Sequence, residues 1–552
     1  MPWSSGTHAY LSFKRNAWIL AILVLAALLR LPRLYADAPA ADLSRSGDLL
    51  ADEGTWAVNA LEWVLTGQWY IPDGYNPGVH SPAFMLFEAA LLKAFGISLY
   101  TLRLGGIICS LISLYTLSLI VVLDRKRNSP VKESSFITLL PVVFAALAYP
   151  LVIFNRVAFL ENLLICFSLW AAYSLLQYIH SNGKIQWLVS CWIALFAGYL
   201  TKPLIVFFCP VLFFMAWRYQ PKRIGSFIRV SAGLTLFFAI ALKIWANHFP
   251  QDTACFYAIN ALSRISLSPI QIVKNYAHHL GHLKLYEFMP VLYALALWMI
   301  GHVAHTPRRL LPPMLLLWSL WLAVGVIFLG FFSYSPPRYS LLLWPAVVGL
   351  AGYFFKDDVS ANLPRPVYLP LFLIAACQGG FGLYRLLASA QHYMSVVFPW
   401  LGMAVMILLY AYFGKRNKSI KRALLAGILV LQLGQISGYY LHPRYSLFTA
   451  MERVRQEIDR DKRSGVIIAG DSAILMGLHA KTRAIDLTYC PEHIPRLINR
   501  VKPQYLFLEN ADEFVRLEQQ MPEYWSRAQL VWSAPLMQNY RFNKDAVFYR
   551  IP

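Results

Sequence analysis

Two adjacent carboxylates, Asp52 and Glu53, open a polar segment directly after the first long apolar run of the chain. Asp52, Thr55, Asn59 and Glu62 recur at the spacing of one helical face, and tryptophans occupy the neighbouring face. Such a helix suits the membrane interface, where aromatic rings settle at headgroup depth. Two interpretations stay open at this point: the acids face water on an interfacial anchor, or they perform acid–base chemistry on a substrate.

Further ionisable residues stand at the ends of later apolar runs. Arg156 and Glu161 share the stretch FNRVAFLEN, Lys202 lies in GYLTKP, and Arg338 precedes Tyr339 in SPPRYS. A single Arg or Lys at such an end usually extends its charged head to the interface. Several cations together with carboxylates on one side of a membrane indicate instead a site that binds a phosphate and activates a hydroxyl.

The elements that must position these residues are membrane-spanning helices. The 552 residues are 58% hydrophobic and 14% charged, with a mean hydropathy of +0.49. Runs of roughly 20 mostly apolar residues, the length that crosses a bilayer, recur along the chain. We therefore expect an α-helical polytopic membrane protein with about thirteen spans, near residues 16–35, 100–123, 135–153, 159–179, 185–200, 203–217, 226–247, 287–304, 311–332, 339–355, 367–387, 394–413 and 421–440.

The basic clusters orient these spans. Most Lys and Arg residues that give the net charge of +21 lie between alternate apolar runs, as in DRKRNSPVK, RYQPKR and GKRNKSIKR, rather than on a nucleic-acid-binding face. This pattern predicts a cytoplasmic N-terminus, an outer first loop over 36–98 and an outer C-terminus. The first run resembles a signal peptide in its flanks, but its length to Tyr35 favours a retained helix.

The last part of the chain, 441–552, has a different composition. Its charge rises, and short β-rich runs such as GVIIAG, QYLFLEN and AVFYRIP alternate with helical stretches. We expect a small soluble α/β domain outside the membrane, after a transmembrane domain over 1–440.

Several motifs in this order resemble the GT-C membrane glycosyltransferases, in particular the superfamily of dolichyl-phosphate-mannose protein mannosyltransferases and bacterial aminoarabinose transferases. They are the acidic pair, then GQWYIP, HSPAFMLF, AFGISLYTLRL and finally PPRYSLLLWP. The resemblance implies a GT-C fold. It also implies an inverting enzyme that moves a sugar from a polyprenyl-phosphate donor to a lipid, glycan or protein acceptor on the outer face.

The resemblance also implies roles for individual residues. Asp52 would be the catalytic carboxylate, Glu53 would support the loop, and Glu161 would be a second acid where the family usually has Asp. The donor phosphate would be bound by a set of residues at the outer ends of the spans: Lys202, Arg338, Tyr339 and Arg156. His80 and Asn59 would contact the acceptor or hold the loop.

Some features of the family stay open in this sequence. His80-Ser81-Pro82 replaces the lysine-bearing turn of aminoarabinose transferases, which favours another sugar. No cofactor beyond the lipid-linked donor is expected with certainty, and a divalent ion between Asp52 and Glu161 is an open alternative. A secondary transporter is the rival function, although no half-to-half repeat is present and the charges gather at outer ends. We expect a bacterial inner-membrane protein surrounded by membrane lipids.

Overall fold

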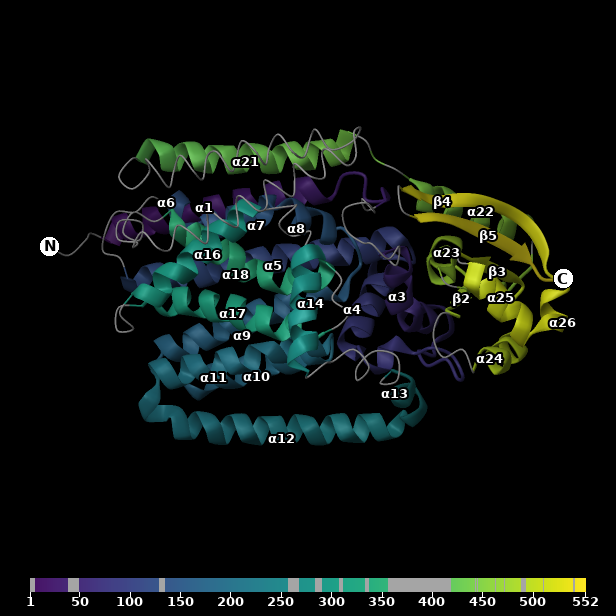
Figure 1. Cartoon of the computed structure of the whole chain (residues 1–552), viewed down its shortest axis with the longest axis horizontal. Helices are drawn as coiled ribbons and strands as arrows, with labels where there is room; N and C mark the ends of the chain where they lie inside the picture. Colours follow the sequence, from purple (N-terminus) through teal and green to yellow (C-terminus); the bar gives the residue numbers. More distant parts are fainter. Residues whose placement is uncertain are drawn as a thin grey trace.

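The computed structural model describes residues 5–37, 49–128, 135–256, 268–282, 290–306, 311–332, 337–355, 418–441, 443, 445–461, 463–470, 472–487, 493–509, 511–539 and 542–552. Most of the long helices run side by side and form an elongated bundle, with a smaller domain at one end (Figure 1). The bundle helices are α1 (Ser5–Arg30), α5 (Leu99–Asn128), α9 (Leu160–His180), α10 (Ile185–Tyr199), α11 (Phe208–Tyr219), α12 (Ile224–His248), α16 (Pro290–His305), α17 (Pro313–Gly330), α18 (Trp344–Phe354) and α21 (Lys418–Leu441). Helix α14 (Pro269–His282) runs across the direction of the bundle (Figure 1).

Within the described residues, five helical segments are long and apolar enough to cross a membrane: Leu99–Leu123, Leu160–His180, Pro221–His248, Pro313–Gly330 and a segment that starts at Lys421. The expected membrane-spanning helices are therefore present, whereas the expected count of about thirteen is not established. The spans expected at 367–387 and 394–413 lie outside the described residues.

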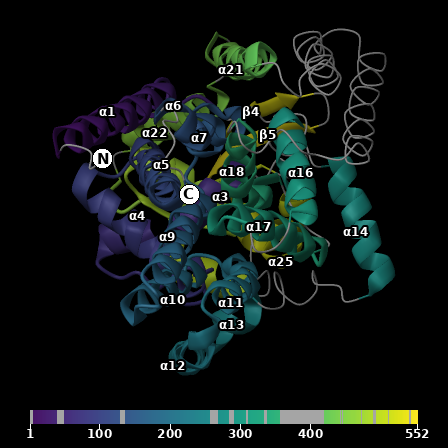
Figure 2. The same cartoon turned by 90° about the vertical axis from the view of Figure 1, so that its left-hand side faces the viewer.

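Helix α12 stands at the margin of the bundle, opposite α21 (Figures 1 and 2). Only 6% of its apolar window is buried in the protein. Its exposed side chains are large and apolar, including Leu236, Phe237, Ile240 and Ile244. In a bilayer such a surface faces lipid tails, which is why an apolar helix can stay so exposed.

The single span expected over 135–153 is wrong in detail, because three short helices occupy it. They are α6 (Ser135–Thr138), α7 (Leu140–Leu147) and α8 (Tyr149–Phe154). Pro141 and Pro150 cause the breaks: each lacks the amide hydrogen of a helix interior and stands in the first turn of a new helix. The spans expected over 203–217 and 339–355 likewise begin with 3₁₀ turns, η2 (Pro203–Phe207) and η6 (Pro337–Leu343).

The first long loop contains the expected helix, α3 (Leu49–Thr66), followed by the 3₁₀ turn η1 (Pro77–Val79) and by α4 (Pro82–Phe95). Small side chains on α3, Ala57 and Ala60, are fully buried. They let α4 and the C-terminal domain pack closely on two sides of this helix.

The C-terminal part forms a five-stranded mixed sheet in the order β2-β1-β3-β5-β4. Strand β1 pairs in parallel with β2 and β3, while β5 is antiparallel to both β3 and β4. Its elements are α22 (Ser446–Asp461), β1 (Ile467–Gly470), α23 (Ala473–Ala480), β2 (Arg483–Ile485), α24 (Ile494–Val501), β3 (Tyr505–Leu508), α25 (Ala511–Gln520), α26 (Pro522–Trp525), β4 (Gln529–Asn539) and β5 (Phe542–Arg550). An α/β arrangement was expected from the sequence.

The C-terminal domain and the first loop share one hydrophobic core. Buried residues of α3, such as Val58 and Leu61, belong to the same cluster as Leu475 of α23 and Phe507 of β3. Helix α3 therefore lies between the bundle and the C-terminal domain, and both parts fix its position.

Candidate functional site

A buried cluster of charges lies where α9, η2 and η6 meet. Glu161 stands in the first turn of α9, where the partial positive charge of a helix N-terminus favours a carboxylate, and its side chain is 1% exposed. Its Oε1 atom accepts a hydrogen bond from Lys202 Nζ at 2.5 Å and lies 3.7 Å from Nε of Arg338. The structure thus brings three of the predicted site residues together, although they are distant in sequence.

Lys202 is held in this cluster by the residue that follows it. Pro203 restricts the preceding residue to extended backbone, and Lys202 has φ −160° and ψ 126° at the start of η2. The ammonium also lies 4.2 Å from the ring centre of Tyr339, a cation–π contact that adds to the ion pair. The guanidinium of Arg338 lies 5.8 Å from the ring centre of Phe159.

The cluster holds two cations and one carboxylate among the described residues. Lys202 and Arg338 remain 13% and 12% exposed, so an anion can reach them, whereas Glu161 is sealed behind them. In this geometry the charge of Glu161 holds the two cations in place, while its predicted role as a second catalytic acid stays a prediction. A site of this kind suits a phosphate group.

Arg156 does not join this cluster. Its NH2 group donates to the carbonyl oxygens of Pro32 and Arg33 at 2.8 and 2.6 Å, and its NH1 group donates to the Tyr440 hydroxyl. The guanidinium also faces the rings of Tyr439 and Tyr440. In the described structure Arg156 thus ties the end of α1 to α21, which corrects its expected place beside Lys202.

Glu53 is fully committed to a buried ion pair. Its carboxylate receives two hydrogen bonds from Arg103 of α5, at 2.9 and 2.7 Å, and a third from the Ala158 amide at 2.9 Å. Arg103 also donates to the carbonyl oxygens of Leu34 and Ala36. Glu53 is only 1% exposed, and these contacts favour the predicted role of Glu53 in supporting the loop.

Asp52 lies in the first turn of α3, adjacent to this anchor. Its side chain is outside the part of the chain that the structure describes. Thr55, less than one turn further along α3, donates a hydrogen bond from Oγ1 to Asp486 Oδ2 of the C-terminal domain at 2.8 Å. The backbone that carries Asp52 is therefore anchored from two directions.

Asn59 holds the loop that follows α3. Its amide donates to the Trp69 carbonyl and to Asn76 Oδ1, and its Oδ1 accepts from the Gly78 amide, all within 2.8 Å. The side chain is fully buried. Of the two roles expected for Asn59, the contacts favour loop support.

Asp252 was not predicted from the sequence as a site residue. It lies in α13 (Pro250–Phe256), directly after α12, and contacts the loop that follows α3. Its carboxylate accepts hydrogen bonds from Tyr70 Oη at 2.9 Å and from Asn76 Nδ2 at 3.0 Å. Burial raises the pKa of Asp252 above its ordinary value, and the two hydrogen bonds oppose that effect. No local pattern marks this acid, because its partners lie more than a hundred positions earlier in the chain.

His80 is also drawn into this junction. Its Nε2 lies 3.2 Å from the Asp252 carbonyl oxygen. Burial lowers the pKa of His80 to about 4, so the imidazole is neutral near pH 7 and Nε2 acts there as the donor. His80 therefore fits loop support in this structure, while contact with an acceptor stays a prediction.

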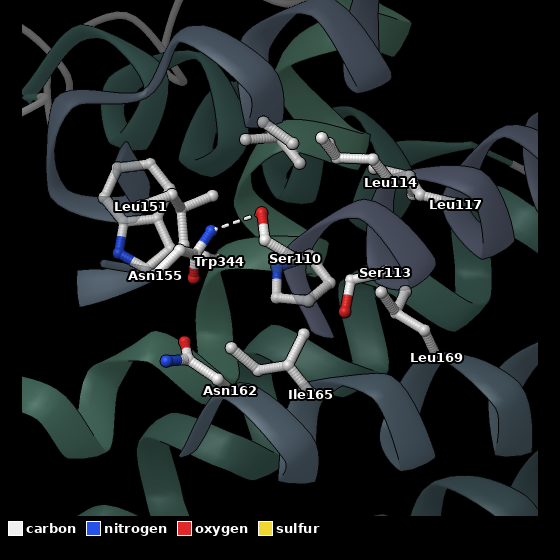
Figure 3. A pocket seen from close by; sticks show the side chains of 13 residues that line it. Ser110, Ser113, Leu114, Leu117, Leu151, Asn155, Asn162, Ile165, Leu169 and Trp344 are labelled. Carbon is white, nitrogen blue, oxygen red and sulfur yellow. Dashed lines mark hydrogen bonds between the residues drawn. The ribbon is translucent and has the colours of Figure 1, made fainter. Parts of the chain in front are cut away.

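A small cavity lies deeper in the bundle, among α5, α9 and α18 (Figure 3). Asn155 donates a hydrogen bond to Ser110 Oγ at 2.7 Å across one side of it. Asn162 and Trp344 line the cavity, and the Oδ1 atom of Asn162 and the indole nitrogen of Trp344 have no hydrogen-bond partner among the residues that the structure describes. Its accessible space of about 30 Å³ suits ordered water rather than a sugar.

Metal ligands are sparse in the described residues, where no group of three or more His, Cys, Asp or Glu side chains lies together. Lys202 occupies one Glu161 oxygen, so the divalent ion between Asp52 and Glu161, an open alternative from the sequence, gains no support from this geometry.

Comparison with solved structures decides the fold. The crystal structure of ArnT from Cupriavidus metallidurans bound to undecaprenyl phosphate aligns with a TM-score of 0.55 at 14% identity, covering 97% of this chain and 98% of ArnT. This chain has the fold of ArnT. The expected GT-C fold is thereby confirmed.

Two further comparisons place that result in context. The apo structure of the same ArnT gives the same TM-score, and the Archaeoglobus fulgidus oligosaccharyltransferase tethered with an acceptor peptide gives 0.46 at 12% identity, covering 92% of this chain and 71% of that one. Neither protein-family models nor curated proteins match the sequence.

Proposed function

We propose that this protein is an inverting glycosyltransferase that moves a sugar from a polyprenyl-phosphate donor to an acceptor of the cell envelope. The observation that carries the proposal is the cluster of Lys202, Arg338 and Tyr339 around buried Glu161. The shared fold supports it, since ArnT was crystallised with undecaprenyl phosphate.

In the proposed reaction an acceptor hydroxyl oxygen attacks the anomeric carbon of the donor sugar. The bond from that carbon to the phosphate oxygen breaks, and polyprenyl phosphate leaves with the electron pair. Lys202 and Arg338 stabilise the negative charge that grows on the leaving phosphate, and Tyr339 holds the lysine. Asp52 accepts the proton of the acceptor hydroxyl.

The site is proposed to face the outer side of a bacterial inner membrane, with a cytoplasmic N-terminus and the C-terminal domain, 441–552, outside. Residues 1–440 would form the catalytic transmembrane domain. The acceptor is a lipid, a glycan or a protein, and His80-Ser81-Pro82 favours a sugar other than aminoarabinose.

The decisive experiment is a transfer assay with the purified protein in lipid nanodiscs. It uses a panel of undecaprenyl-phosphate sugars and detects released undecaprenyl phosphate and glycosylated acceptor by mass spectrometry. Asp52→Asn should abolish turnover, whereas Asp73→Asn makes the same change at another acid of the same loop and should retain it. Chelation followed by addition of Mg²⁺ or Mn²⁺ shows whether a divalent ion takes part.

Turnover by Asp52→Asn at the native rate would refute the catalytic assignment. Uptake of solute into proteoliposomes without any lipid-linked donor would favour the transporter instead. The position predicted for the charge cluster, at the outer ends of the spans, argues against transport, because transporter sites lie near the membrane midplane.

A further inference from the structure

The C-terminal domain contacts α3 on the side away from the bundle, through two polar contacts. Thr55 Oγ1 donates to Asp486 Oδ2 at 2.8 Å, and Arg483 donates to both oxygens of Glu62 at 3.1 and 2.5 Å. Thr55 and Asp486 are each 2% exposed and Glu62 is 5% exposed. Buried polar contacts of this kind fix the rotation and register of a helix more strictly than apolar packing does.

Close packing supports these contacts. A Cβ atom on Gly54 would lie 3.0 Å from Leu475 Cγ and 3.3 Å from the Leu475 backbone nitrogen. Helices α3 and α23 are therefore so close at this point that a side chain larger than that of glycine would be crowded. Leu475 is fully buried in the core that both parts share. The domain is therefore seated directly on the helix turn that carries Asp52.

Helix geometry makes the two anchors complementary. Glu53 and Thr55 are two positions apart, which places them about 200° apart around the helix axis. Glu53 is held by Arg103 on the bundle side, and Thr55 is held by Asp486 on the outer side. Both anchors lie within one turn of Asp52, so small changes in either shift the backbone of the proposed catalytic residue.

We propose that Asp486 and Thr55 form a positioning pair through which the C-terminal domain sets the orientation of the catalytic helix. The proposal rests on the proposed function, and it makes the outer domain part of the catalytic machinery rather than an appended module. Neither residue contacts the donor phosphate site, so the pair acts on the geometry of transfer and leaves donor binding unchanged.

Thr55→Val is the primary test, because it removes the hydroxyl and keeps the shape of the side chain. We expect kcat to fall about tenfold, since small misplacements of reacting groups are costly, while KM for the lipid donor and affinity for polyprenyl phosphate stay within about twofold. Thr55→Ser restores the hydroxyl and should recover most of kcat. Asp486→Leu should resemble Thr55→Val, and the double variant should be no worse than the more impaired single variant.

The outcomes separate the two proposals. If Asp52→Asn abolishes transfer but Thr55→Val leaves kcat unchanged, the positioning pair is refuted and the proposed function stands. If Asp52→Asn leaves transfer intact, the catalytic assignment fails first. If Thr55→Val lowers kcat and donor affinity together and the protein no longer elutes as a monodisperse species, the contact serves folding in general. That result would also overturn the positioning proposal.

Discussion

Opposite charge changes at the Glu161 cluster should have opposite effects on donor binding. Lys202→Met removes a cation and leaves Glu161 against Arg338 alone, so affinity for polyprenyl phosphate should fall. Glu161→Gln removes the negative charge that lies 2.5 Å from Lys202 Nζ and 3.7 Å from Arg338 Nε. The positive charge of both cations is then no longer neutralised within the protein, and the affinity for polyprenyl phosphate should rise.

The size of both effects follows from Coulomb's law. Two unit charges about 5 Å apart interact with about 3 kcal/mol at an effective dielectric constant of about 20. Partial access of solvent reduces this value, because both cations are somewhat exposed. We therefore expect changes of about 10-fold to 100-fold in the dissociation constant, and both should shrink as salt concentration rises.

Native mass spectrometry or a fluorescence titration with polyprenyl phosphate in detergent measures these affinities directly. Lys93→Met serves as the matched control, because Lys93 lies over the Trp63 ring, away from the cluster, and its loss should change nothing. Glu161→Gln should also lower thermal stability without lipid, since two cations then repel each other, and bound lipid should restore it.

Two results would contradict this account of the cluster. If Lys202→Met binds the lipid as well as the native protein, the lysine is no phosphate ligand. If both variants lose affinity equally, the ordering of Lys202 and Arg338 by Glu161 outweighs the repulsion between its carboxylate and the phosphate, and the expected gain in affinity for Glu161→Gln is wrong.

Two further predictions concern buried charges near the loop. Glu88 of α4 is 2% exposed, and neither of its carboxylate oxygens has a hydrogen-bond partner within the described part of the chain; burial together with nearby Glu53 raises its pKa well above 4.5. Glu88→Gln should therefore raise the free energy of unfolding by about 1–3 kcal/mol near pH 8, and the gain should fade towards pH 4, where the Glu88 carboxyl is protonated in the unfolded chain as well. Thermal unfolding across pH measures this, and an equal gain at both ends would contradict it. Arg103→Met should lower the free energy of unfolding by about 3–5 kcal/mol, because Glu53 then stays buried without its cation, and adding Glu53→Gln should recover part of that loss. A double variant whose loss of stability equals the sum of the losses of the two single variants would argue against the pair.

The sequence predicted the membrane fold well because hydropathy reports directly on the bilayer. Apolar runs marked the places of most described helices, and β-rich runs marked β1, β3 and β5. The three-part structure over 135–154 was missed, because Leu, Val and Phe dominate the run and hide the effect of Pro141 and Pro150. Hydropathy measures transfer into lipid, and it does not register a missing amide hydrogen.

The candidate site was predicted in part. Charged residues at the ends of apolar runs correctly indicated that Glu161, Lys202 and Arg338 lie together, since a buried charge needs an oppositely charged partner. Arg156 was placed wrongly by the same reasoning. It donates to the backbone carbonyl oxygens of Pro32 and Arg33, and no side-chain pattern in the sequence indicates such partners. Asp252 was missed because its role depends on contact between segments distant in the chain.

The adjacent acids at the start of α3 show how one motif divides into support and chemistry. Neighbouring helix positions lie about 100° apart, so both carboxylates cannot enter the same pocket. The three hydrogen bonds to Glu53 hold α3 against α5 and the turn before α9. They fix the rotation of α3 about its axis, and this rotation determines the position of the backbone at residue 52. Glu53, a buried neighbour of the proposed catalytic acid, can therefore contribute to the reaction without touching the substrate. On this account an Asp52 variant should lose rate with little loss of stability, and a Glu53 variant should lose both.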